Sequence, residues 1–268
     1  MPELPDVEIF RRLVQRHGVG HLISHVAVHD PDSLEGASAA SLQRRLNGKR
    51  LHSCRRHGKH LFIDIADAGA LAMHFGTNGS LQHLGRDQAD PPSVRLSLDL
   101  ADDGRLAYVN PRRIGRVRLV DSTEAFIAES QLGPDALDPA FDAAEFAASL
   151  AGRKQAIKAV LMDQTRMAGI GNIYADEILF QARLHPDTPA ATVDRAATRR
   201  LFDAMRFVLQ TAIDCGAGAE AFTDRLPPGF LLPQRHAGGH CPRCGTALQV
   251  DRRGGRTGYH CPACQPGG

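Results

Sequence analysis

Four of the six cysteines stand in two close pairs, Cys241-x2-Cys244 and Cys261-x2-Cys264, with sixteen residues between the pairs. Each pair can occupy a tight turn that points two thiolates at one metal ion, and two pairs complete a tetrahedral shell. Such a shell leaves no position for water, so its metal is structural. We predict one structural Zn2+, held by these four cysteines.

Three arginines lie in the glycine-rich stretch between the cysteine pairs: Arg252, Arg253 and Arg256. Arginine can bind a phosphate through two parallel hydrogen bonds, and glycine lets the backbone come close to it. This composition favours contact with nucleic acid. A protein–protein contact is the alternative interpretation.

The chain starts with Met1-Pro2-Glu3. Removal of Met1 would leave Pro2 with a secondary α-amine, and α-amines titrate near ~8, far below lysine. A useful fraction is then unprotonated at neutral pH and can act as a nucleophile, with Glu3 beside it for acid–base catalysis. The alternative is that this segment only leads into a helix.

The stretch AGIGNIYA at 168–175 joins two helical patterns. Its glycines allow a sharp turn, and Asn172 can cap the helix that follows. Free amides at that helix end form an anion site, which suits a DNA phosphate. Any helix hairpin could use such a turn, so this motif alone does not decide the function.

The elements that position these groups follow from periodicity. Residues 5–17 carry apolar side chains at helical spacing. From about 22 to 120, short runs alternate between apolar and polar residues, as in 61–65 and 94–100, with a turn at Asp103-Gly104. We predict an N-terminal β-sandwich with a leading helix, its strands linked by turns and not by helices.

Helical patterns follow Leu132-Gly133-Pro134, where we place a domain boundary. Asp142 resembles the first residue of a capping box, and helices are expected at 154–163, 173–183 and about 193–214. The stretch 216–239 predicts no firm element. The fold class is therefore α+β, with domains at 1–131 (catalytic β-sandwich), 132–235 (helical) and 236–268 (zinc ribbon).

Composition sets broad limits. A hydrophobic content of 43% supports real cores, yet no run approaches the ~18 apolar residues of a membrane span. The first residues lack the pattern of a secretory signal. The net charge of +2 does not itself indicate nucleic acid, but basic residues cluster around 55–59 and 112–118. Cys54 and Cys215 stand alone and are expected to be buried small side chains.

Together these motifs resemble the formamidopyrimidine-DNA glycosylase / endonuclease VIII family across essentially the whole chain. The matching pieces are PELPDVE, HGKHL, NPRRIG, LGPDAL, AGIGNIYADE and CPRCG…GGRTGYHCPACQ. The resemblance implies a β-sandwich, a helix-two-turn-helix domain and a zinc finger, with damaged double-stranded DNA as the partner. The PELP start favours the formamidopyrimidine-DNA glycosylase branch.

The resemblance also implies a base-excision glycosylase with abasic-site lyase activity. Pro2 matches the nucleophile that forms a Schiff base at C1′, Glu3 matches the carboxylate that acts in base release and ring opening, and Lys59 matches the catalytic lysine. Successive β- and δ-elimination would then remove both phosphates. The positions that match or accompany DNA-binding residues are His74, Arg112, Ile114, Lys154, Asn172 and Arg256. Their contacts would offset the cost of flipping the base.

Two regions depart from the family pattern. Members that act on oxidised purines insert a methionine, an arginine and a phenylalanine; here Thr77 and Ile114 replace the first and the last, and only Arg112 matches. The lesion-recognition stretch after the long helix is replaced by residues 216–222. Oxidised or ring-opened purines are the expected substrates, but these changes leave the lesion open.

Two alternatives follow. The chain could act mainly on abasic sites or other lesions, or it could bind damaged DNA without catalysis. The presence of Pro2, Glu3 and Lys59 argues against a pure binder, which has no need of that trio. We expect a monomer in the cytoplasm, associated with the nucleoid of a bacterial-type cell.

Overall fold

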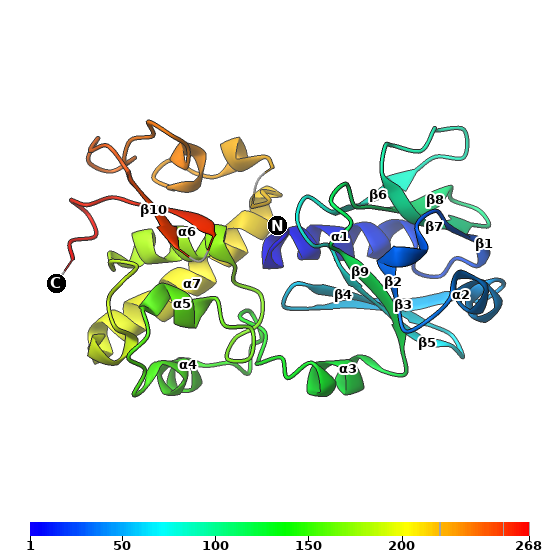
Figure 1. The fold of residues 1–268 in the computed structure, drawn as a ribbon, viewed down its shortest axis with the longest axis horizontal. Coiled ribbons are helices and arrows are strands. Elements are labelled where there is room, and N and C mark those ends of the chain that lie inside the picture. The colour runs from blue at the N-terminus through cyan, green and yellow to red at the C-terminus, as the bar shows by residue number, and fades with distance from the viewer. Residues whose placement is uncertain (220, 254, 268) are drawn as a thin grey trace. The chain divides into compact units, whose positions relative to one another are not determined.

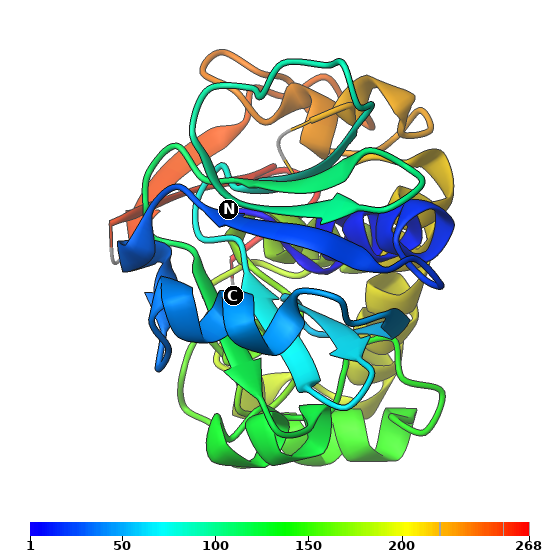
Figure 2. The ribbon, with the colours of Figure 1, turned by 90° about the vertical axis from the view of Figure 1, so that its right-hand side faces the viewer.

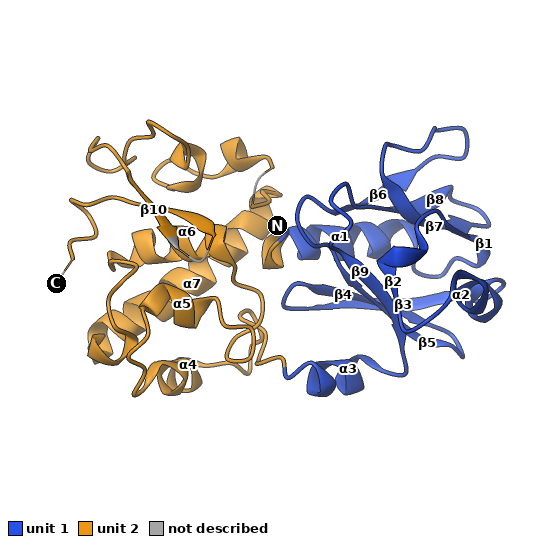
Figure 3. Ribbon diagram, in the orientation of Figure 1, with its two compact units in different colours: residues 1–2, 6–131 blue, residues 3–5, 132–268 orange. Residues whose placement is uncertain are grey.

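The computed structural model describes residues 1–219, 221–253 and 255–267, and only the backbone of Arg253. The chain divides into two compact units, Met1–Pro2 with Asp6–Gln131 and Glu3–Pro5 with Leu132–Gly268 (Figure 3). The three predicted domain ranges stay predictions beside this division.

Two β-sheets of the first unit enclose one hydrophobic core. One sheet has the strand order β1 (Ile23–Val28), β7 (Val94–Leu100), β8 (Arg105–Val109), β6 (Ser80–Leu84). The other has the order β2 (Leu34–Glu35), β9 (Arg116–Val120), β5 (Gly69–His74), β4 (His60–Ile65), β3 (Leu51–His57). Leu61 and Met73 of one sheet share a buried cluster with Leu98 and Leu106 of the other, and Figure 2 shows the sheets as separate layers. The predicted sandwich is confirmed.

The helices around this sandwich only partly follow the prediction. The leading helix is present as α1 (Leu4–His17), and its Val7 and Val14 are fully buried in the sandwich core. The expectation of turns alone between the strands is wrong, because α2 (Ala39–Leu46) separates β2 from β3. Ser38 caps α2 by accepting a hydrogen bond from the amide of Ser41. A serine at this place is a typical helix start, but the strand patterns on both sides of it favoured a turn.

Further helical turns complete the first unit. They are the 3-10 turn η1 (Pro31–Ser33) and α3 (Thr123–Glu129), the second of which follows β9. Cys54 on β3 is buried as expected, and burial raises the pKa of its thiol. Cys215 is only half-buried, against the core of the second unit.

The second unit is built from helices and one hairpin (Figure 1). Its elements are α4 (Ala143–Leu150), α5 (Ile157–Leu161), α6 (Asn172–Ala182), η2 (Ala190–Thr192), α7 (Arg195–Cys215), η3 (Thr223–Arg225), η4 (Leu232–Gln234), β10 (Gln249–Arg253) and β11 (Arg256–His260). The hydrophobic face of α7 packs on α6, and both contribute to one large core. Among the described residues of 216–239, which exclude 220, the only regular elements are the short 3-10 turns η3 and η4, as predicted.

Side-chain caps explain the helix boundaries that the sequence located well. Asp142 accepts hydrogen bonds from the amides of Ala144 and Glu145, and Asp194 accepts one from Ala197 at the start of α7. Gly216 ends α7 in the left-handed conformation, with φ 64°.

The helix predicted at 154–163 is shorter, since only Ile157–Leu161 is helical. The preceding residues are extended: the amide of Ala190 donates to the carbonyl of Gln155 at 2.9 Å, and that of Ile157 donates to Thr188 at 2.8 Å. Residues 155–157 therefore pair with residues 188–190 in place of forming the first turn of the predicted helix. This pairing joins residues more than thirty positions apart, so local periodicity could not predict it.

Candidate active site

Glu3 lies at the N-terminal end of α6 and is only 1% exposed. Its Oε2 accepts hydrogen bonds from the amides of Gly171 at 2.7 Å and Tyr174 at 3.1 Å, and its Oε1 accepts one from Ile173 at 2.9 Å. A helix leaves its first amides without internal partners, and its dipole places partial positive charge there. The helix end therefore stabilises this buried carboxylate and holds it in one orientation.

This arrangement corrects two expectations about the glycine turn. The amides expected to be free for a DNA phosphate are occupied by the chain's own carboxylate. Asn172 is not the cap, because Gly171 holds that position and Asn172 is the first helical residue. The Nδ2 of Asn172 instead donates to the carbonyl oxygen of Thr257 at 2.7 Å.

The glycine turn also holds the backbone next to Glu3. The amide of Leu4 donates to the carbonyl oxygen of Gly169 at 3.1 Å. Gly169 has φ +121°, and a Cβ at this position would lie 2.5 Å from Cδ1 of Leu4. Only glycine therefore permits this close approach.

Asp176, on α6, is 1% exposed and has three charged or polar partners. Its Oδ1 pairs with Nζ of Lys158 at 2.5 Å, while its Oδ2 accepts from Nε of Arg235 at 2.9 Å and from the amide of Tyr259 at 3.0 Å. Burying a carboxylate is costly unless it is paired and hydrogen-bonded in this way.

The same network fixes the hairpin of β10 and β11 on α6. Thr257, on β11, accepts from Nη2 of Arg235 at 2.6 Å as well as from Asn172. A Cβ at Gly258 would lie 2.6 Å from Nζ of Lys158 on α5, so a larger residue there would displace this ammonium group. Arg256 begins β11, and its position therefore depends on these contacts.

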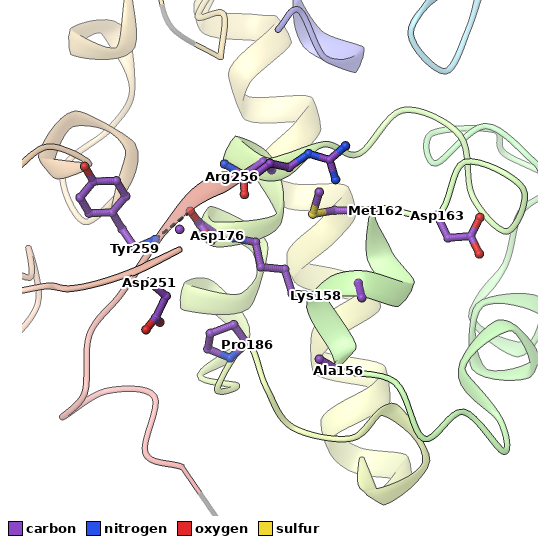
Figure 4. A pocket seen from close by; sticks show the side chains of 12 residues that line it. Ala156, Lys158, Met162, Asp163, Asp176, Pro186, Asp251, Arg256 and Tyr259 are labelled. Atoms are coloured by element: carbon purple, nitrogen blue, oxygen red, sulfur yellow. Dashed lines mark hydrogen bonds and ion pairs between the residues drawn. The ribbon is translucent and has the colours of Figure 1, made fainter. Parts of the chain in front are cut away.

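A cavity of about 330 Å³ opens beside this network (Figure 4). It is lined by Asn172 and Arg256, which were predicted to bind DNA, together with Lys158. Lys154 does not line the cavity and is exposed. The sequence analysis did not identify Lys158 as a residue of this site. The only indication in the sequence was its position one helical turn after Lys154.

We expect Asp176→Asn to weaken binding of abasic-site DNA by tenfold or more, equivalent to about 1.4 kcal/mol. The amide has a similar size but leaves the half-buried cations Lys158 and Arg235 without this negative partner, which loosens the hairpin that carries Arg256. Fluorescence anisotropy at fixed salt measures the change. The control is Asp203→Asn, which breaks only the exposed pair with Arg199 on α7. Wild-type affinity in Asp176→Asn would contradict the positioning role.

The four paired cysteines converge in the second unit. Their Sγ atoms all lie within 4.8 Å of one another, with 3.7 Å between Cys241 and Cys264 and 3.6 Å between Cys244 and Cys261. A tetrahedral site with Zn–S bonds of ~2.3 Å has sulfur–sulfur edges of about 3.8 Å. The cluster therefore has the spacing of a closed four-thiolate metal site, as the sequence predicted.

Lys59 of the first unit is 7% exposed and lies in the turn between β3 and β4. His60 pairs with His74 across β4 and β5, with ring centroids 5.1 Å apart. Burial, with an added effect from the Lys59 charge, lowers the pKa of His74 to about 4. Burial, with an added effect from the neighbouring His74, lowers the pKa of His60 to about 3. Pro2 is half-buried in the same unit.

His74 is therefore neutral at physiological pH, and its tautomer follows from one contact. Its Nδ1 accepts a hydrogen bond from the amide of Gly76 at 3.3 Å. The ring proton is then on Nε2, which becomes a hydrogen-bond donor. This neutral donor can bind a phosphate oxygen without bringing a second charge next to Lys59.

The first unit should lose stability as the pH falls from about 6.5 to about 4. Both histidines have a lower pKa in the folded state than their ordinary value of 6.5, so the unfolded chain binds more protons in this range. The contribution of the two neutral histidines to the stability of the folded unit is complete above pH 6.5 and is lost as the pH falls below it. Thermal denaturation between pH 7.5 and 4.5 measures this dependence.

The matched variant is His60→Phe. Nδ1 of His60 is buried without a hydrogen-bond partner among the described residues, and the ring contacts Phe62 and Phe126, so phenylalanine fits its surroundings. It should flatten the pH dependence, whereas His25→Phe at an exposed position of β1 should not. Equal steepness in all three proteins would show that His60 does not titrate as described.

The two loops expected to carry the DNA wedge pack on each other. Gly76 has φ +56°, and a Cβ there would lie 2.7 Å from the carbonyl carbon of Ile114. The Nδ2 of Asn110 donates to the carbonyl of Phe75 at 2.8 Å and so holds the start of the loop that contains Gly76. Ile114 itself is 51% exposed, so it presents an apolar side chain from a fixed loop. Thr77 is half-buried in the neighbouring loop.

Arg112 precedes Ile114 in this loop and is also exposed. In the divergent stretch 216–222, Ala217 is buried, and its carbonyl accepts a hydrogen bond from the hydroxyl of Tyr174 at 3.0 Å. Glu220 of this stretch lies outside the described residues. Phe222 is 57% exposed and stacks under the guanidinium of Arg225, 4.0 Å from the ring centroid.

Comparison with known proteins gives this architecture a class. Residues 1–117 match the formamidopyrimidine-DNA glycosylase N-terminal domain, and residues 132–224 match the formamidopyrimidine-DNA glycosylase H2TH domain. A β-sandwich, an H2TH domain and a four-cysteine cluster together define a base-excision DNA glycosylase.

Full-length relatives give the family. The formamidopyrimidine-DNA glycosylase of Acidothermus cellulolyticus is 38% identical and that of Methylococcus capsulatus 37%; the alignments cover 99% of this chain and 98% and 100% of theirs. The chain belongs to the formamidopyrimidine-DNA glycosylase family.

Solved structures agree. The Lactococcus lactis enzyme non-covalently bound to an AP-site-containing DNA has a TM-score of 0.88 at 29% identity, covering 99% of this chain and 100% of that one. The complex of the same enzyme with an oxidised-pyrimidine-containing DNA gives 0.89 at 29% identity, with the same coverage. Within the described residues, no helix combines the length and apolar character needed to cross a membrane.

Proposed function

We propose that the chain removes damaged bases from double-stranded DNA and cleaves the abasic strand, with Pro2 as nucleophile and Glu3 and Lys59 as its catalytic partners. The observation that carries this proposal is the fixed carboxylate of Glu3, the residue directly after Pro2. It is held by the amide of Gly171, which caps α6, and by two amides of the first turn of α6. A protein that only binds DNA has no need of Pro2, Glu3 and Lys59 together.

The chemistry follows from a secondary amine. After removal of Met1, the nitrogen of Pro2 attacks C1′ of the lesion nucleotide, the base departs with a proton, and opening of the sugar ring gives an iminium ion. The iminium acidifies the neighbouring C2′–H, so loss of that proton expels the 3′ phosphate, and a further elimination expels the 5′ phosphate. Glu3 acts in base release and in ring opening, since it can accept and return a proton.

Lys59 supplies a positive charge near the lesion. Its side chain is largely buried, and a buried cation interacts more strongly with a phosphate than an exposed one. His74 adds a neutral donor through Nε2. Both groups lie in the first unit, on or next to strands β4 and β5.

The remaining DNA contacts come from both units. In the first unit, Arg112 would enter the space left by the flipped base, and Ile114 would act as an apolar wedge. In the second unit, Asn172 and Arg256 line one cavity and would hold a phosphate together, with Lys154 as a further contact.

The metal of the four-cysteine cluster is one structural Zn2+ in this proposal. The sulfur spacing fits Zn2+, and a closed thiolate shell leaves no site for catalysis. The ion would stabilise a ribbon whose hydrophobic cluster contains few side chains, notably Phe180 and Leu231.

A panel of duplexes tests the proposal. Each carries 8-oxoguanine, a formamidopyrimidine, an oxidised pyrimidine or an abasic site, and both base release and strand cleavage are measured. Base release and cleavage on at least one lesion support the proposal. Cleavage of the abasic duplex alone would identify a lyase, the variant favoured by Thr77 and Ile114. Binding without release or cleavage on any duplex would identify a damaged-DNA binding protein.

We propose a monomer, because one chain supplies every proposed catalytic residue. The proposed location is the cytoplasm, in association with the nucleoid, because DNA is the proposed substrate. Light scattering of the DNA complex measures the stoichiometry. A mass of two chains per duplex would contradict the monomer.

A further inference from the structure

Lys59 lies in a two-residue hairpin turn of the first unit. β3 ends at His57 and β4 begins at His60, and these two residues pair across the strands. Gly58 has φ +56°, which suits the first position of a two-residue turn between antiparallel strands. The contacts that hold this turn therefore also set the position of the Lys59 ammonium group.

Arg56 binds this turn from within β3. Its Nη1 donates to the carbonyl oxygen of Gly58 at 3.3 Å, and its Nε lies 3.5 Å from Oε2 of Glu8 on α1. The side chains of Arg56 and Glu8 are only 10% and 14% exposed, so water and salt screen their attraction less than that of a surface pair. The guanidinium is thus held between α1 and the turn that carries Lys59.

Glu8 is also held by its own helix. Its carboxylate accepts hydrogen bonds from Nε and Nη2 of Arg11, at 3.0 and 2.9 Å, and from Nε of Arg12 at 3.2 Å. Burial raises the pKa of Glu8, but the surrounding arginines outweigh burial and lower this pKa below its usual value. Glu8 is therefore ionised at neutral pH, and α1 presents it to Arg56 as a fixed negative charge.

A second contact joins α1 to the same side of β3. Side chains two positions apart on a strand point to the same side, so Cys54 and Arg56 share one face of β3. Sγ of Cys54 donates to the carbonyl oxygen of Arg11 at 3.4 Å. Since α1 begins at Leu4, the helix that contacts Arg56 is the one that follows the proposed nucleophile Pro2.

We infer that Arg56, anchored to α1 by Glu8, is a positioning residue for Lys59; this inference rests on the proposed function of that lysine. Arginine suits the role because its guanidinium presents separate nitrogens to Glu8 and to the carbonyl of Gly58, whereas a lysine has only one nitrogen. Arg56 exchanges no proton in the proposed reaction. It acts by holding the ammonium group in place, and a misplacement of about 1 Å can slow a reaction ~100-fold.

Single-turnover cleavage of abasic-site DNA by Arg56→Gln tests the inference. The rate of the bound complex should fall by at least about tenfold, while the DNA affinity, measured by fluorescence anisotropy, changes by less than about twofold. Glu8 keeps its hydrogen bonds to Arg11 and Arg12 in this variant, so its carboxylate is not left unpaired. Should Arg56→Gln fail to fold, Arg56→Lys keeps the charge beside Glu8 and should still slow cleavage, because one nitrogen cannot hold both partners.

A double-mutant cycle separates positioning from a merely structural role. Lys59→Ala should lower the cleavage rate by about 100-fold or more. Adding Arg56→Gln should then lower it by less than about twofold further, because Arg56 acts only through Lys59. A general loss of structure would instead multiply the two effects.

The matched control is Arg45→Gln. Nη2 of Arg45 donates to the carbonyl oxygen of Ala68 at 3.1 Å, in the turn at the other end of β4. This variant also removes an arginine that binds a turn of the same sheet, but it should cleave abasic DNA at the wild-type rate.

Three results overturn the inference. They are a wild-type cleavage rate in the folded Arg56 variant, weaker DNA binding with an unchanged rate of the bound complex, and multiplied effects in the double variant. The proposed function stands in all three cases if Lys59→Ala is slow. A wild-type rate in Lys59→Ala would instead remove Lys59 from the proposed function, and this inference with it.

Discussion

Blocking the amine of Pro2 with a short N-terminal extension is expected to reduce borohydride trapping on abasic-site DNA by at least about 1,000-fold, as removal of a covalent nucleophile does elsewhere. The extension turns the secondary amine into an amide, whose nitrogen has no available lone pair. DNA affinity should change much less, because the proposed phosphate contacts are distant in the sequence and remain intact. Trapping is quantified as covalent complex on a denaturing gel.

The matched control is the same extended protein after proteolytic release of its extension, which should recover full trapping. Pro2→Gly, with Met1 removed, keeps a terminal amine but loses the ring. It should trap more than the extended protein and less than the wild type. Full strand cleavage by a chain whose terminus is verified by mass as blocked would falsify the assignment of Pro2.

The second large effect is expected from the cysteine cluster. Cys261→Ser should lower the zinc content from about one ion per chain to nearly none and weaken binding of abasic DNA by about 100-fold or more. The ribbon depends on the metal because its hydrophobic cluster is small, and β11 carries Arg256. Loss of the ribbon also removes Thr257 and Tyr259 from Asn172 and Asp176.

Metal analysis and fluorescence anisotropy measure these two losses. Cys215→Ala, at the half-buried end of α7, is the control and should keep both zinc and affinity. Some trapping by Pro2 should persist in Cys261→Ser at high protein concentration, since Pro2 and Lys59 belong to the other unit. Unchanged DNA affinity in a verified metal-free protein contradicts a role for the ribbon in binding.

Several features could be predicted because their physical cause is local. A Cys-x2-Cys pair closes within one turn, so the four cysteines were assigned without knowledge of the fold. Strand alternation and the caps at Asp142 and Asp194 depend on neighbouring residues in the same way. The motif order from PELPDVE to the last cysteine pair then indicated the family, which the comparisons confirm.

Features that depend on distant residues could not be predicted. Glu3 meets the amides of α6 across 168 positions or more, so no window of sequence shows that these amides are occupied. The cap assigned to Asn172 was wrong for the same reason. Lys158 and Asp176 gain their place at the Arg256 hairpin only when β11 packs on α6.

Local chemistry along the chain therefore determined which reactive groups this protein has: a proline amine, a neighbouring acid, a lysine and a four-thiolate cluster. Tertiary structure decided what each group meets. Burial and long-range hydrogen bonds selected Glu3 over a phosphate as partner of the α6 amides, made His74 a neutral donor, and brought Glu8 of α1 to Arg56 of β3. Such pairings depend on packing free energy summed over the whole unit, which no single motif contains.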